Sequence, residues 1–114
     1  MSDLFADRMA ALRQRFAGQL DSRIDGIETA MLQREDDDLD VLAQAHRDAH
    51  HLCGVGATLG FAGTGTVARS IEQILLAAVK SRRKLNDDEL PVVRAGIALL
   101  RSTASDELRA GMIG

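Results

Sequence analysis

Residues 45–61 read AHRDAHHLCGVGATLGF, and the change in composition within this stretch divides one helical pattern from the next. Up to its middle, apolar residues recur every three or four positions, which is typical of one face of an amphipathic helix. Glycines then follow at positions 54, 56, 60, 63 and 65. Because glycine in a helix interior is less favourable than alanine by about 1 kcal/mol, this helix is predicted to run from about Leu39 to the mid-fifties. Its expected apolar face consists of Leu42, Ala45, Ala49, Leu52, Cys53 and Gly56.

Three further amphipathic segments are predicted, one before this helix in the sequence and two after it. The first 34 residues carry a single apolar stripe with steps of three and four residues, which predicts one long helix. The members of that stripe are Phe5, Met9, Leu12, Phe16, Leu20, Ile24, Ile27 and Met31. A helix from about Thr66 to Ser81 is predicted after the glycines, with the inward residues Val67, Ile71, Ile74, Leu75 and Ala78. The last helix is expected to begin around Asn86 to Asp88, with the inward residues Leu90, Val93, Ile97, Leu100 and Leu108.

Local signals fit the ends of these helices. The acidic run 35–38 suits the start of the second helix, because acidic side chains favour the positive end of the helix dipole. Pro91 is tolerated only in the first turn of the last helix, where it lies if Asp88 is the cap. Four amphipathic helices with short connections predict an all-α protein. We expect residues 1–114 to form a single domain, an antiparallel four-helix bundle with a long N-terminal helix.

Composition narrows the classes of function. The 114 residues carry 14 basic and 17 acidic side chains, so no nucleic-acid partner is expected. Aromatic residues make up 3%, without tryptophan or tyrosine, which disfavours a stacking platform for bases or sugars. The longest apolar stretches are far below the roughly 20 residues that span a bilayer, and the charged N-terminus lacks the core of a secretory signal. With a single cysteine, we expect a soluble cytoplasmic protein that does not bind a membrane.

All three histidines lie on the predicted second helix, and helical rotation separates them. Relative to the centre of the apolar face, His46 lies on the margin and His50 lies roughly 100° away, at the edge of the buried face. His51 is expected about 160° away, pointing into water. Arg47 and Gly54 flank His50 on its outer side, one turn before it and one turn after it. A glycine one turn from a surface histidine leaves the imidazole uncovered, which suits a ring that a bulky partner must reach.

Residues 50–54, HHLCG, followed by LGF at 59–61, resemble the histidine-containing phosphotransfer (HPt) domain, including the version that opens chemotaxis histidine kinases. That family's pattern is His-x-Leu-Lys-Gly, with a further glycine ten residues after the histidine. His50 and Gly60 meet this spacing. The predicted four-helix pattern extends the resemblance over nearly the whole chain.

The resemblance implies that His50 acts in a two-component phosphorelay. In that family the neutral imidazole accepts a phosphoryl group from a receiver aspartate or a kinase and passes it to a response-regulator receiver. Mg²⁺ is supplied by the partner receiver, so the chain is expected to have no cofactor or metal of its own. In the resembling domains a glutamate or glutamine on the next helix orients the imidazole, and the equivalent position here is Glu72. The alternative for Glu72 is a solvated surface side chain.

The resemblance also implies a docking face around His50, made of Arg47, Gly54, Ala57 and Arg69. The expected partners are a response-regulator receiver domain, a hybrid histidine kinase, or both. Where the family has lysine this chain has Cys53, which we expect to be mainly a packing residue, and Arg47 or Arg69 is the candidate to replace the charge. A chain of 114 residues leaves no room for an ATP-binding domain, so we expect a carrier without kinase activity of its own.

Three other interpretations of the same residues are open at this point. His46, His50 and Cys53 fall at i, i+4 and i+7, a spacing compatible with Zn²⁺, although no fourth ligand is evident. The glycines at 54, 56 and 60 superficially resemble a dinucleotide fingerprint, which needs a preceding strand and a following helix. The third interpretation is a helical binding module, a degenerate HPt domain that docks or sequesters a receiver without being phosphorylated.

Overall fold

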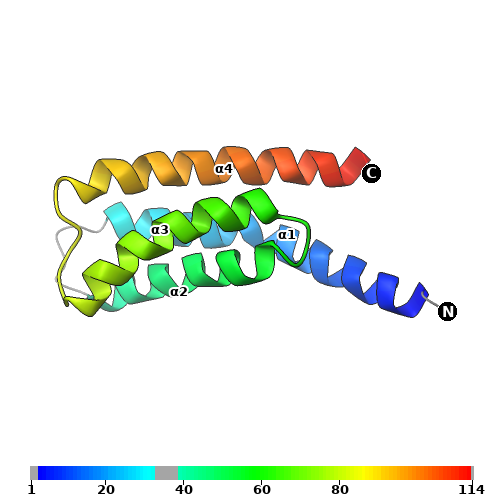
Figure 1. Ribbon diagram of the computed structural model, residues 1–114, viewed down its shortest axis with the longest axis horizontal. Helices are drawn as coiled ribbons and strands as arrows, with labels where there is room; N and C mark the ends of the chain where they lie inside the picture. The colour runs from blue at the N-terminus through cyan, green and yellow to red at the C-terminus, as the bar shows by residue number, and fades with distance from the viewer. Residues whose placement is uncertain (1–2, 33–38, 114) are drawn as a thin grey trace.

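The computed structural model describes residues 3–32 and 39–113, and this part of the chain forms four helices. They are α1 (Asp3–Leu32), α2 (Leu39–Gly56), α3 (Ala62–Lys80) and α4 (Glu89–Ile113). Consecutive helices run in opposite directions (Figure 1), which confirms the predicted all-α antiparallel bundle and its long first helix. The acidic run 35–38, predicted to favour the start of the second helix, lies outside the described residues.

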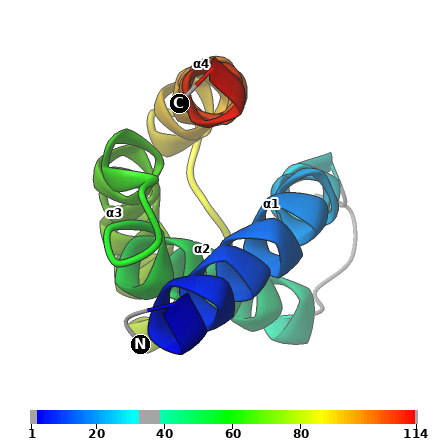
Figure 2. The same ribbon diagram turned by 90° about the vertical axis from the view of Figure 1, so that its right-hand side faces the viewer.

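Each helix packs against two others, so the bundle is a ring of four around one apolar core. α1 contacts α2 and α4, and α3 contacts the same two helices (Figure 2). Large side chains that are fully buried come from every helix, namely Leu20, Ile24, Ile27, Leu52, Ile71, Leu75, Val93 and Leu100. Burial of one such side chain contributes about 1.5–3 kcal/mol. No helix within residues 3–32 and 39–113 combines the length and the apolar character needed to cross a membrane.

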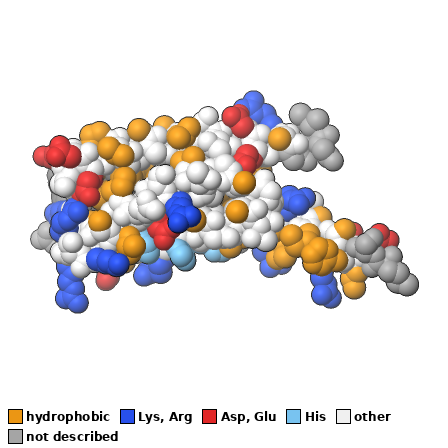
Figure 3. Space-filling view, in the orientation of Figure 1, with side chains coloured by type: hydrophobic (Ala, Val, Ile, Leu, Met, Phe, Trp, Pro, Cys, Tyr) orange, Lys and Arg blue, Asp and Glu red, His pale blue; other side chains and the backbone are white. Residues whose placement is uncertain are grey.

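The apolar stripe of α1 lies in two different surroundings. Four later members are buried, namely Phe16, Leu20, Ile24 and Ile27, and the side chain of Met31 lies outside the described ones. In contrast, Phe5 is 72% exposed and Leu12 is 46% exposed, so the first turns of the stripe do not face the core. These turns project beyond α2 and α3 (Figure 1), and hydrophobic side chains gather on the projecting end (Figure 3). Periodicity indicates which face of a helix is apolar, but a neighbouring helix is needed to bury that face.

Three glycines shape the connection between α2 and α3. α2 ends at Gly56, whose carbonyl oxygen accepts a hydrogen bond from the Phe61 N–H at 2.7 Å. Gly60, inside this turn, has a φ of 91°, a left-handed conformation that other residues rarely adopt. At Gly65, near the start of α3, a Cβ atom would lie 3.2 Å from the carbonyl oxygen of Cys53. Glycine at this position therefore lets the backbones of α2 and α3 approach each other closely.

α3 begins at Ala62, earlier than the predicted start near Thr66, because α4 supplies its cap. The Glu107 carboxylate on α4 accepts hydrogen bonds from the backbone N–H groups of Gly63 at 3.0 Å and of Thr64 at 2.7 Å. It also accepts one from the hydroxyl of Thr64 at 2.6 Å, and Thr64 is fully buried. The free N–H groups of a helix start are more often satisfied by a local side chain. A cap from another helix leaves no signal in the local sequence. Gly63 and Gly65, which lie before the predicted start of the helix, are therefore helical in the structure.

α4 begins at Glu89, and of the residues 86–88 at which the start was expected, Asn86 rather than Asp88 is the cap. The side-chain oxygen of Asn86 accepts hydrogen bonds from the N–H groups of Asp88 and Glu89 at 3.0 and 2.8 Å. The Glu89 carboxylate accepts one in return from the N–H of Asn86 at 3.0 Å, which completes a capping box. Counted from Glu89, where α4 begins, Pro91 is the third residue of the helix.

Glu107→Ala should lower the free energy of unfolding by about 1–3 kcal/mol, because it leaves the buried Thr64 hydroxyl and two N–H groups without their acceptor. Urea denaturation measures this change. The matched control is Asp106→Ala, which removes an exposed carboxylate that accepts from Arg109 at 2.9 Å. The control should cost less than about 0.5 kcal/mol. Equal unfolding free energies for the two variants would contradict the capping role of Glu107.

Candidate functional site

A histidine and a glutamate join α2 to α3 at the surface of the bundle. Nδ1 of His50 lies 2.7 Å from Oε1 of Glu72, so the structure brings together the two residues that the family resemblance pairs. A carboxylate can only accept a hydrogen bond, so in the neutral ring the hydrogen lies on Nδ1 and the lone pair lies on Nε2. The side chain of His50 is 70% exposed, whereas that of Glu72 is 15% exposed. The pair therefore holds an imidazole at one nitrogen and leaves its nucleophilic nitrogen accessible.

The residues predicted to surround His50 all reach the surface. Gly54 lies one turn further along α2, and a Cβ atom at this position would meet open space. Arg47, on the preceding turn, is exposed and donates two hydrogen bonds to the side-chain oxygen of Gln44, at 2.7 and 3.3 Å. The other exposed members of the predicted docking face are Ala57 and Arg69. Figure 3 shows histidine side chains at the surface with acidic and basic side chains beside them.

His46 and Cys53 lie on the less exposed side of His50. The rings of His46 and His50 are stacked, with 6.2 Å between their centroids and 21° between their planes. Nε2 of His46 is 3.6 Å from Oε1 of Glu72, which is longer than a hydrogen bond. Cys53 is half-buried and packs against the apolar core. The closeness of His46 to Glu72 is not predicted from the sequence, although its i, i+4 spacing from His50 is a signal that points to it.

His51 does not point into water, contrary to the expectation from helical rotation. Its side chain is half-buried, and its ring centroid lies 6.2 Å from that of Phe16 on α1. Burial lowers the pKa of His51 and the positive charge of Arg23 lowers it further, while Asp48 acts in the opposite direction. Rotation about α2 alone is misleading here because α1 packs along this flank of α2.

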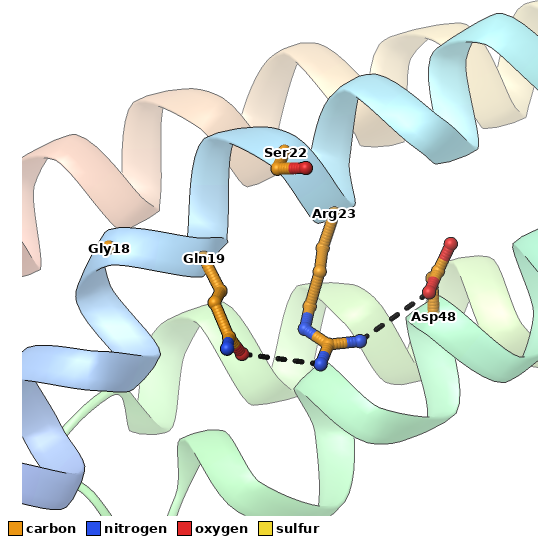
Figure 4. A pocket seen from close by; sticks show the side chains of 5 residues that line it. All are labelled: Gly18, Gln19, Ser22, Arg23 and Asp48. Atoms are coloured by element: carbon orange, nitrogen blue, oxygen red, sulfur yellow. Dashed lines mark hydrogen bonds and ion pairs between the residues drawn. The ribbon is translucent and has the colours of Figure 1, made fainter.

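A separate polar cluster links α1 to α2. Nη1 of Arg23 lies 3.5 Å from Oδ1 of Asp48, and Nη2 donates to the side-chain oxygen of Gln19 at 3.3 Å. With Gly18 and Ser22, these side chains line an open pocket (Figure 4). The pocket contains no histidine, and its cation and anion face each other. Its evident role is to hold the two helices together.

The geometry does not support two of the alternative interpretations. Within the described residues, no three histidine, cysteine, aspartate or glutamate side chains are grouped as a metal site requires, and this includes His46, His50 and Cys53. The glycines at 54 and 56 lie in the last turns of α2, and Gly60 lies in the turn that follows. A dinucleotide fingerprint needs a strand before its glycines, and the described residues that precede these glycines are helical.

Comparison with known protein families agrees with the geometry of this site. The family model described as the Hpt domain matches residues 11–103. The matched range covers most of the chain and includes α2, α3 and all the residues placed around His50 above. No solved structure matches the chain.

The pKa of His51 should lie below 6.5, and an NMR titration of its imidazole measures it. Because the unfolded chain then binds a proton more readily than the folded one, the free energy of unfolding should fall as the pH drops below about 6.5. His51→Gln should reduce this fall, which urea denaturation at about pH 7.5 and 5.5 tests. A His51 titration midpoint at or above the ordinary value would show that packing against α1 does not disfavour the charged ring.

Proposed function

The chain belongs to the Hpt domain family, whose members act in phosphotransfer within phosphorelays, and on this basis we propose that His50 is the residue that carries the phosphoryl group. Hpt domains interact with receiver domains and kinases. One observation supports the choice of His50 above all. Its Nδ1 is bound to Glu72 at 2.7 Å while the side chain stays 70% exposed, so Nε2 is both oriented and open to a partner.

The proposed reaction is an in-line transfer between the His50 imidazole and an aspartate of a receiver domain. The lone pair of Nε2 attacks phosphorus, the N–P bond forms, and the bond from phosphorus to the aspartate oxygen breaks with its electron pair leaving on the carboxylate. The ring keeps its hydrogen on Nδ1 and becomes positively charged. The Glu72 carboxylate, at 2.7 Å from Nδ1, balances that charge. Transfer to a second receiver reverses these steps.

The surface around His50 is the proposed docking face for the receiver. Gly54 leaves open space one turn from the ring, so a partner's active site can approach Nε2 without meeting a side chain. Arg47 and Arg69 are exposed and offer positive charge to the phosphoryl group in place of the lysine that Cys53 replaces. Ala57 adds a small residue to this face, next to the turn after α2.

The proposed partner also accounts for the metal ion and the compartment. Phosphoryl transfer uses Mg²⁺ to neutralise charge on the phosphoryl oxygens, and we assign this ion to the receiver domain. In this chain, the Glu72 carboxylate beside His50 accepts a hydrogen bond from Nδ1, so we do not assign the ion to it. The single cysteine and the proposed receiver partner both fit a reducing compartment, so the cytoplasm is the proposed location.

One observation favours a second candidate function, a binding module that sequesters a receiver without being phosphorylated. The family pattern has lysine three residues after the histidine, and this chain has the half-buried thiol of Cys53 there. The two functions differ in one measurable property. A phosphorelay carrier acquires acid-labile, base-stable phosphate when it is mixed with a phosphorylated receiver, and a binding module does not.

His50→Gln should abolish labelling by a panel of receiver domains that carry radioactive phosphate, because glutamine has no nucleophilic ring nitrogen. The free energy of unfolding should stay within about 0.5 kcal/mol of the wild type, since the side chain is exposed. His51→Gln is the matched control and should keep the label. Retention of the label in His50→Gln, or its loss in His51→Gln, would contradict the assignment. A stable receiver complex without label on the wild type would favour the binding module.

Gly54→Leu should slow transfer from a phosphorylated receiver about tenfold or more, because a side chain would fill the open space beside the ring. It should also stabilise the helix by several tenths of a kcal/mol. Gly18→Leu is the matched control, since a Cβ atom at Gly18 also meets open space, but on α1. The control should gain similar stability and keep the wild-type rate in single-turnover transfer. Equal rates for both variants would argue against a receiver approaching over Gly54.

A further inference from the structure

His46 has a shielded nitrogen without a partner next to the proposed phospho-acceptor. The side chain is 20% exposed, and its Nε2 is closed to solvent with no hydrogen-bond partner among the described residues. Shielded polar groups are nearly always paired, because an unpaired one is unfavourable. An acceptor lies close by, since Oε1 of Glu72 is 3.6 Å from this nitrogen. The unpaired nitrogen therefore lies beside the carboxylate that is bound to His50.

Glu72 can accept from both imidazoles. Oε1 of Glu72 already accepts from Nδ1 of His50 at 2.7 Å, and a carboxylate oxygen has two lone pairs. The rings of His46 and His50 are stacked one turn apart on α2, so they reach Glu72 from the same helix. A shift of about 0.6 Å would bring Nε2 of His46 to about 3.0 Å from Oε1, an ordinary hydrogen-bond distance.

The two histidines differ in how easily they can leave Glu72. His50 is 70% exposed and is the ring that a partner contacts, whereas His46 is 20% exposed. In the free protein an exposed ring samples other rotamers, and whenever His50 does so Glu72, whose side chain is only 15% exposed, loses its donor. A shielded carboxylate without a donor is unfavourable. His46 is the group in position to supply the missing hydrogen bond.

We infer that His46 is a positioning residue, whose Nε2–H donates to Glu72 and keeps the carboxylate in place for Nδ1 of His50. His46 does not contact the phosphoryl group in this arrangement, and its effect on His50 passes through Glu72. The effect on transfer rate rests on the proposed phosphotransfer function. The effect on the His50 tautomer does not rest on that function, because the tautomer is measured in the free protein, without a phosphorylated partner.

Two variants of His46 separate hydrogen-bond donation by the side chain from packing of the ring. His46→Phe keeps an aromatic ring but has no donor, and His46→Gln keeps an N–H donor but has no ring. Both are compared with the wild type and with His51→Gln, after urea denaturation has shown that each is folded. The first measurement is the His50 tautomer, from the nitrogen chemical shifts of the ¹⁵N-labelled imidazole. The second is single-turnover transfer from a phosphorylated receiver domain. His46→Leu replaces His46→Phe if the larger ring prevents folding.

The wild type, His46→Gln and His51→Gln should all show the hydrogen of His50 on Nδ1. His46→Phe should show a mixture of tautomers and transfer about 3- to 10-fold slower, the effect expected from losing one orienting hydrogen bond. An unchanged tautomer in His46→Phe would overturn the inference, as would a His46→Gln variant as impaired as His46→Phe. If the wild type takes no label but the tautomer shifts in His46→Phe, the proposed phosphotransfer fails while the positioning role of His46 stands.

Discussion

The close approach of α2 and α3 is the constraint on which the rest of this structure depends. At Gly65, a side chain would place its Cβ atom 3.2 Å from the carbonyl oxygen of Cys53, closer than most such contacts in proteins. A larger residue there would push the two backbones apart by a few tenths of an ångström, which a closely packed core resists. Their separation sets the reach from Glu72 to His50, and a hydrogen bond of 2.7 Å between those side chains needs the short spacing. A backbone contact near the turn thus controls an imidazole further along the bundle.

α1 and α4 contribute no side chain to the His50–Glu72 pair, but they support α2 and α3, which do. Glu107 on α4 satisfies the N–H groups that begin α3, so the helix that carries Glu72 has a fixed start. On the other side, Nε of Arg13 on α1 donates to the carbonyl oxygen of Leu59 at 2.9 Å, within the turn that joins α2 to α3. An exposed imidazole keeps a defined orientation only when its supports are rigid. In this protein those supports come from residues that are distant in the sequence.

One helix places three histidines in three environments, and the neighbouring helices create the difference. His50 extends into solvent, and its Nδ1 is bound to the Glu72 carboxylate. His46, one turn earlier, is shielded and faces the same carboxylate from α3. His51 packs against Phe16 from α1, where burial lowers its pKa. The same residue type therefore has three different surroundings, and the roles that we propose for His50 and His46 follow from which helix covers each ring.

The sequence by itself determined the four helices and the exposed position of His50, because helical periodicity and glycine propensity act over neighbouring residues. The pairing of His50 with Glu72 came from the family pattern, since periodicity alone does not show which helices meet. Only the tertiary structure decided that α3 starts at Ala62, that His51 is covered and that the first turns of α1 are not. Each of these features depends on whether another helix lies close by. The Glu107 carboxylate of α4 lies at the start of α3, whereas the first turns of α1 project beyond α2 and α3. Local patterns show which face of a helix is apolar, whereas its burial is settled by the packing of distant segments.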